Sequence, residues 1–292
     1  MFRLVLDCTV RKSIGLASFR SCFSAVLVFV LPCPLALAWG ERGHRIVNAA
    51  AVNNLPEPLK SYFRTRIGYL VEHASDPDYL ARENPQERPH HYTEVEAYDS
   101  YPFVAFRAQF VDQRRAPSPR QLEHGDSVWQ IEQFTLQLSK DLQRRRWKES
   151  DRDAVFAAHY ACDLTQPLHT VVNYDGQLTR QAGIHARFET MLVNALADGW
   201  LLKPQPAVNE PDLRARIFRE YVDSYNQRQL IFAADRIALD GHTYLDPQVL
   251  RAFIQIDGLL ARKRLEAAAS FVSSLWYTAW VRAGKPALGT RN

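Results

Sequence analysis

Apolar residues recur at roughly helical spacing through much of the chain. Residues 127–142 carry such a stripe, and residues 153–164 continue without Gly or Pro until Pro167, where a helix ends or kinks. Residues 213–226 and 250–284 have the same character, the latter being rich in Ala, Leu and Arg. No long run alternates polar and apolar residues, so the pattern predicts helices and not strands.

Clusters of Pro, Gly, Asn and Asp separate these segments and predict loops. They lie at residues 76–78, 84–89, 116–119, 174–177 and 203–206. No repeat, low-complexity tract or interdomain linker interrupts the rest of the chain. We therefore predict a single all-α domain.

The first 38 residues differ from the remainder. A start with four basic residues and one acid is followed by an apolar run over residues 25–37, which ends in Ala36-Leu37-Ala38. This is the pattern of a secretory signal peptide. We predict cleavage after Ala38, which leaves an exported domain of residues 39–292 in the periplasm or outside the cell. The alternative is an uncleaved membrane anchor, but the run is short for a span of about 20 residues and contains Pro32 and Pro34.

Removing this leader changes the charge and the cysteine count. The full chain has a formal charge of +4, and the leader takes four of its 36 basic and one of its 32 acidic residues, which leaves about +1. Such a charge gives no long-range steering toward nucleic acid. Of the four cysteines only Cys162 remains, which excludes an intramolecular disulfide. The fold must then be stabilised by its core or by bound metal.

Histidines and acids carry the candidate chemistry. His159 and Asp163 are four residues apart and so share a helix face, and His169 follows. His185 and Glu189 repeat the four-residue spacing. One such pair alone is more often a surface ion pair. Two pairs and a further His within about 30 residues favour a metal site, and imidazole with carboxylate suits zinc.

Two further segments add candidate ligands. Cleavage would give Trp39 a free α-amino group, which binds zinc when deprotonated, and His44 lies five residues later. A loop carboxylate, Asp76 or Asp78, and the imidazole of His91 come next along the chain. The remaining histidines are interpreted as ordinary surface or loop residues, namely His73, His90, His124 and His242.

Taken in order, these segments resemble the superfamily of zinc-dependent phospholipases C and single-strand-specific zinc nucleases. Its marks are an N-terminal Trp after signal cleavage, a His-x3-Asp-x5-His block containing Gln-Pro-Leu-His, and a later His-x3-Asp or His-x3-Glu. All three occur between Trp39 and Glu189. The resemblance implies a mostly α-helical fold with three zinc ions in a cleft.

The resemblance also implies a ligand set. One zinc would be held by Asp78, His91, His159 and Asp163. A second would be held by His169, His185 and Glu189. The third would be held by the amino nitrogen and carbonyl oxygen of Trp39, by His44 and by a shared Asp163. We prefer Asp78 to Asp76 because the family places this acid at the end of an Ala-Ser-x-x-Asp stretch, which residues 74–78 match.

The reaction implied by the resemblance is hydrolysis of a phosphodiester by a water activated between two zinc ions. The third zinc would neutralise charge on the phosphate. Asp78 is the catalytic candidate, since it would also orient the attacking water. The nucleases carry an Arg three residues after this acid, but here Ala81 stands there and Arg82 follows. A phosphate-clamping role for Arg82 stays open.

The motifs leave the substrate open. The Trp-Gly-x-x-Gly-His start resembles the nucleases, whereas the pairing of His185 with Glu189 resembles the phospholipases. We expect a monomeric phosphodiesterase with no obligate protein partner that acts on single-stranded nucleic acid. One alternative is a phospholipase C acting on phospholipid head groups. Another is a noncatalytic secreted helical protein in which zinc is structural. No residue is assigned to substrate binding.

Overall fold

The computed structural model describes residues 39–289, and the predicted signal peptide lies outside them. Helices, with short 3-10 and π turns, make up the regular structure of this part of the chain, which contains no strand. The prediction of an all-α fold is confirmed. The longer helices are α1 (Gly40–Asn54), α4 (Asp76–Glu83), α7 (Ser127–Gln143), α8 (Trp147–Thr165), α11 (Leu213–Leu239) and α12 (Pro247–Arg282).

Shorter pieces connect these helices. The short α-helices are α2 (Leu59–Arg64), α3 (Ile67–Glu72), α5 (Val104–Arg107), α6 (Pro119–Leu122), α9 (Ile184–Ala186) and α10 (Val193–Leu196). The 3-10 turns are η1 (Arg88–His91), η2 (Val95–Ala97), η4 (Pro167–Thr170) and η6 (Ala197–Gly199). The π turns are η3 (Ala108–Asp112) and η5 (Arg187–Leu192).

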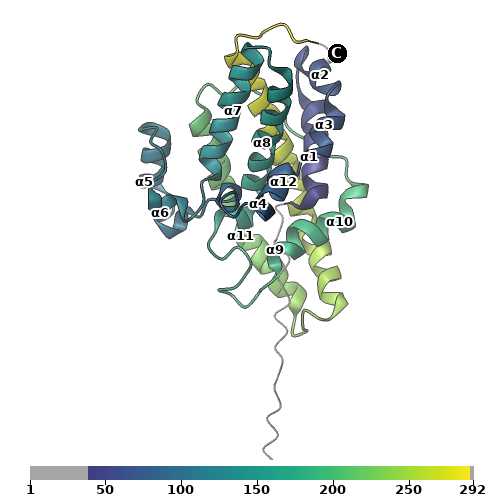
Figure 1. The fold of residues 1–292 in the computed structure, drawn as a ribbon. Coiled ribbons are helices and arrows are strands. Elements are labelled where there is room, and N and C mark those ends of the chain that lie inside the picture. Colours follow the sequence, from purple (N-terminus) through teal and green to yellow (C-terminus); the bar gives the residue numbers. More distant parts are fainter. Residues whose placement is uncertain (1–38, 290–292) are drawn as a thin grey trace, which may run out of the picture. The chain divides into compact units, whose positions relative to one another are not determined.

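Helix α12 is the central element of the core. It packs against α1, α7, α8 and α11, as Figure 1 shows. Its apolar residues are therefore buried on several faces instead of forming one stripe. Trp276 of α12 is fully buried, stacks on Phe63 with ring centroids 4.8 Å apart, and donates to the carbonyl of Ala154 in α8 at 3.0 Å. One hydrophobic core thus surrounds α8, the helix that carries the candidate ligands His159 and Asp163.

Several helices begin or end at other residues than the sequence pattern predicted. Helices α11 and α12 begin at the carboxylate caps Asp212 and Asp246, and both run further than the periodic pattern indicated at one end. The loop expected at residues 76–78 is wrong, because these residues form the first turn of α4 with Pro77 inside it. Proline is tolerated there since the first N–H groups of a helix have no intrahelical partner. No helix within residues 39–289 is long and apolar enough to cross a membrane.

Candidate metal centre

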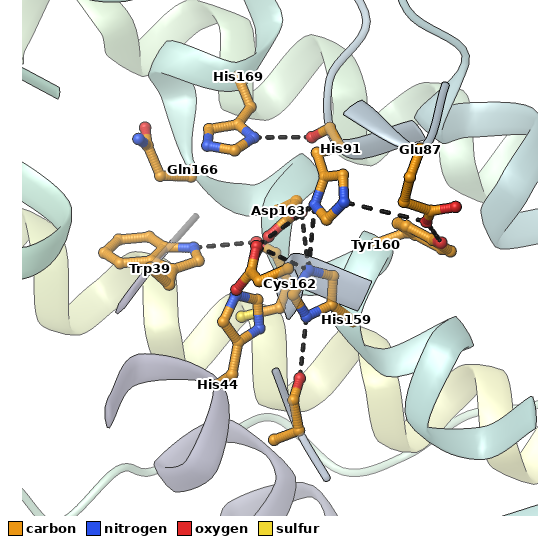
Figure 2. A network of polar contacts seen from close by, with 12 residues as sticks. Trp39, His44, Glu87, His91, His159, Tyr160, Cys162, Asp163, Gln166 and His169 are labelled. Atoms are coloured by element: carbon orange, nitrogen blue, oxygen red, sulfur yellow. Dashed lines mark hydrogen bonds and ion pairs between the residues drawn. The ribbon is translucent and has the colours of Figure 1, made fainter. Parts of the chain in front are cut away.

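Asp163 lies at the centre of the first candidate group. Its carboxylate is fully buried on α8, one turn after His159. Three imidazoles from three elements surround it: His44 Nε2 lies 3.3 Å from Oδ1, and His91 Nδ1 and His159 Nε2 lie 3.0 and 3.4 Å from Oδ2. Figure 2 shows these rings pointing toward the same carboxylate. Helices α1 and α8 and the turn η1 therefore meet at one acid.

Asp78 joins this group from α4. Its Oδ1 lies 3.5 Å from His159 Nε2 and 3.6 Å from His91 Nδ1, and the residue is 97% buried, with 3% exposed. Its Oδ2 has no hydrogen-bond partner. Asp76 instead pairs at 2.8 Å with His73, and about 38% of its side chain is exposed. The geometry therefore favours Asp78 over Asp76.

A second buried group follows α8. His169 Nε2 and His185 Nε2 are 3.2 Å apart, and Glu189 Oε2 lies 3.6 and 2.9 Å from them. His185 comes from α9 and Glu189 from the π turn η5, four residues later. The amide of Gln166 donates to Glu189 Oε2 at 3.1 Å, whereas Oε1 has no hydrogen-bond partner. Three close ligand atoms thus meet beside the first group.

The imidazoles are held in one tautomer by backbone carbonyls. The Nδ1 atoms of His159, His169 and His185 lie 2.9, 2.7 and 3.1 Å from the carbonyl oxygens of Ala74, His91 and Tyr174 respectively. A carbonyl only accepts, so each Nδ1 carries a proton and each Nε2 faces its group, where it can bind a metal ion once it has lost its own proton. His91 is reversed, with Nδ1 facing Asp163 and Nε2 4.0 Å from the carboxylate of Glu87.

Trp39 is fixed beside the first group. It is fully buried, and its indole donates at 2.9 Å to the carbonyl of Cys162, the residue before Asp163. A Cβ on Gly43 would lie only 2.8 Å from the Cβ of Trp39, so glycine permits this close approach. In the full chain the nitrogen of Trp39 is joined to residue 38. Its role as a ligand therefore stays a prediction.

The buried carboxylates of both groups need positive charge beside them. Burial alone would raise the pKa of Asp163, but His159 and its neighbours outweigh this and hold the pKa well below its usual value. Burial alone would lower the pKa of His159, yet Asp163 and Asp78 raise it to about 9. The pKa of His169 rises to about 8, with Glu189 overcoming the effect of burial. Without metal, protons on these rings balance the buried carboxylates.

The donor chemistry fits zinc. Each of three sets of residues has ligand atoms within 4.8 Å of one another: His44 with Asp78 and His159, His91 with His159 and Asp163, and His169 with His185 and Glu189. Imidazole nitrogen and carboxylate oxygen are zinc donors. Asp78 Oδ2 and Glu189 Oε1 are buried oxygens without a hydrogen-bond partner. A bound cation would satisfy Glu189 Oε1, and a cation or a water beside it would satisfy Asp78 Oδ2. The structure thus brings together every predicted side-chain ligand.

Other candidates lie outside these groups or were missed. The four histidines interpreted as ordinary each pair with a nearby carboxylate outside the three sets, namely His73, His90, His124 and His242. Glu87 was not predicted, although its place four residues before His91 was the available signal. Gln166 was noted only as part of a motif, and its contact with Glu189 spans 23 residues.

Two comparisons with known proteins bear on this geometry. A family model described as S1/P1 Nuclease matches residues 39–183. The match begins at Trp39 and includes the whole first group and His169, whereas His185 and Glu189 follow it. No curated protein matches the chain.

Proposed function

The chain belongs to the S1/P1 nuclease family, and on that premise we propose that it is an exported zinc-dependent phosphodiesterase that cleaves single-stranded nucleic acid. The observation that carries this proposal is the convergence of three histidines on the buried carboxylate of Asp163. The adjacent group around Glu189 supports it. The signal-peptide pattern of residues 1–38 supports export.

Nine residues are proposed to hold three zinc ions. The first zinc is assigned to Asp78, His91, His159 and Asp163. The second is assigned to His169, His185 and Glu189. The third is assigned to the amino nitrogen and carbonyl of Trp39, to His44 and to Asp163. Asp163 has two carboxylate oxygens, and these face different histidines, which suits a shared ligand.

When bound, zinc supplies Lewis acidity that lowers the pKa of a water and stabilises negative charge on a phosphate. The protein supplies positioning and burial. Asp78 is the proposed catalytic residue, because its Oδ2 has no partner and can accept a hydrogen bond from the attacking water. Burial alone would raise the pKa of Asp78, but His159 holds it below its usual value, so this carboxyl is ionised and accepts at neutral pH.

Two exposed aromatic rings, one next in the chain to Asp78 and one packed on His185, support a nucleic-acid substrate. Tyr79 follows Asp78 on α4 and is 39% exposed, and the guanidinium of Arg82 lies 5.2 Å from its ring centre. Tyr174 is 47% exposed, and its ring packs edge-on against His185 with centroids 5.9 Å apart. Aromatic rings stack on bases of any sequence, and a neighbouring cation suits the backbone phosphate.

One alternative substrate is favoured by a specific residue. Glu189, paired with His185 at 2.9 Å, occupies the position at which the sequence resembles the phospholipase branch. A phospholipase C acting on head groups is therefore the second candidate. It would use the same ligands and differ in what the exposed rings contact.

The test is an assay of the protein that begins at Trp39 on single-stranded DNA, RNA and phosphatidylcholine vesicles, each with and without chelator. We expect chelator-sensitive cleavage of DNA or RNA and no release of lipid head groups. Cleavage of phosphatidylcholine alone would assign the chain to the second candidate. No cleavage of any of these substrates by fully zinc-loaded protein would overturn the enzymatic proposal. A matched variant, His185→Ala, should be inactive in every case.

A further inference from the structure

Arg187 lies between His185 and Glu189 in the chain but does not face the metal group. Residues two apart on a helical turn do not share a face. Its side chain reaches α11, where it forms an ion pair with Asp235, 48 residues later. Arg187 is 8% exposed and Asp235 fully buried. A buried ion pair thus sits behind the turn that presents two candidate ligands.

The guanidinium of Arg187 also donates hydrogen bonds to the backbone just before this turn. Its Nε and Nη2 both lie 2.9 Å from Asp235 Oδ1. Nη1 donates to the carbonyl of Ala182 and Nη2 to that of Gln181, each at 3.0 Å. A Cβ on Gly183, where φ is +84°, would lie 3.0 Å from Nη1. Glycine therefore serves both the left-handed backbone and the close approach of Arg187.

Asp235 is held in turn by its own partners. Its second oxygen accepts from the hydroxyl of Tyr244 at 2.6 Å and from the amide of Gln181 at 2.9 Å. The ring of Tyr244 lies 4.0 Å from the guanidinium carbon of Arg187. The pair is thus enclosed by planar groups that fix its orientation.

A buried ion pair is weak evidence for net stability, because well-packed apolar residues often stabilise as much. The contribution of the Arg187–Asp235 pair is to fix the orientation of the turn, because a guanidinium donates to several acceptors in one plane. Two ligands on one turn reach a common ion only at one rotation of that turn. The ion pair between Arg187 and Asp235, on the opposite side of the turn, sets this rotation.

We infer that Arg187 and Asp235 are positioning residues that hold His185 and Glu189 in register with His169 for metal binding. This inference rests on the proposed metal role of that group. Asp235 belongs to α11, beyond residues 39–183, which the family model matches. The C-terminal part of the chain therefore sets the geometry of a metal group whose first ligand, His169, lies in the matched part.

The test measures zinc retained per chain against a graded concentration of chelator, together with thermal unfolding of the metal-free protein. Arg187→Lys and Asp235→Asn are expected to release one ion at about tenfold lower chelator concentration than the wild type. His185→Ala marks which ion this is. Tyr244→Phe keeps the ring and removes one bond to Asp235, so it should shift the same ion by a smaller factor if the stronger variants fail to fold.

Arg66 provides a matched control. It is 1% exposed, pairs with Asp151 at 3.0 Å, and its guanidinium lies 3.7 Å from the ring of Tyr62. Arg66→Lys should lower thermal stability and leave zinc retention unchanged. If the variants at Arg187, Asp235 and Tyr244 retain zinc as Arg66→Lys does, the inference is wrong. If His185→Ala also retains all its zinc, the proposed metal group itself is wrong.

Discussion

The imidazole of His169 donates its Nδ1 proton to the backbone carbonyl of His91, 2.7 Å away. A candidate ligand of one group is thereby oriented by the main chain of a ligand in the other. The same turn, η1, supplies Nδ1 of His91 to Asp163. The two groups therefore form one connected centre, and a change in the backbone at His91 should alter the geometry of both.

The two acids at the start of α4 should differ sharply in effect. Asp78→Asn is expected to lower kcat on single-stranded DNA by about a hundredfold or more, because the variant loses the carboxylate that faces His91 and His159. Asp76→Asn is the control, since its exposed side chain contacts only His73 among the histidines. Steady-state kinetics compares the two. Equal losses in both would contradict the assignment of Asp78.

Zinc affinity should rise with pH between about 6 and 9. In the metal-free protein the pKa values of His159 and His169 are raised to about 9 and 8, so both rings carry protons at neutral pH. Zinc must displace these protons, and binding becomes easier as pH rises through those values. Titration in weak buffer at pH 7 should show proton release on zinc addition. Affinity that stays constant over this range would argue against these ligands.

Adding one residue to the protein that begins at Trp39 should weaken one zinc site. The indole of Trp39 donates to the carbonyl of Cys162, the residue before Asp163, which holds Trp39 beside the first group. One extra Gly before Trp39 would convert the free amine into an amide, which is a poor zinc ligand. We expect the extended protein to bind one zinc fewer at equal chelator concentration. Unchanged zinc content would show that the amine is not a ligand.

The buried carboxyl of Asp257, which lies away from the candidate ligands, should make the protein less stable as pH rises. A carboxyl paired with a cation has the opposite effect. Burial, with a contribution from Asp235, raises the pKa of Asp257 to about 7. The folded state then favours the protonated form, so stability is lost as pH rises from about 4 to about 7. Asp257→Asn mimics that form and should stabilise the protein at pH 8 by up to about 4 kcal/mol. The gain should shrink toward pH 4 in denaturant titrations, and a pH-independent effect would refute this account.

The regular part of the fold was predictable from local pattern. Helix α7 matches its predicted segment within a residue, because apolar spacing and helix packing are the same constraint. Residues 76–78 were mistaken for a loop, since proline and aspartate mark both loops and first turns of helices. Burial of Asp78 in the site, which separates it from Asp76, came only from the fold.

The candidate ligands were predictable because their spacing is local and their order along the chain is distinctive. The residues that orient these ligands were not predictable. Asp235 is one acid among many in a helical segment, and its contact with Arg187 spans 48 residues. Gln166 contacts Glu189, 23 residues later, through a side chain whose partner is set by packing, which no short pattern encodes.

The most direct test is to restore zinc stepwise to the metal-free protein that begins at Trp39 and to follow cleavage of single-stranded DNA. The account predicts no cleavage without metal and full activity only when the groups around Asp163 and Glu189 are both filled. Asp78→Asn removes a proposed ligand of the first zinc and the proposed acceptor for the water, so it should not recover this activity at any zinc loading. Cleavage by the metal-free protein, or none at full zinc loading, would contradict the central claim that these buried groups form a phosphodiester-cleaving metal centre.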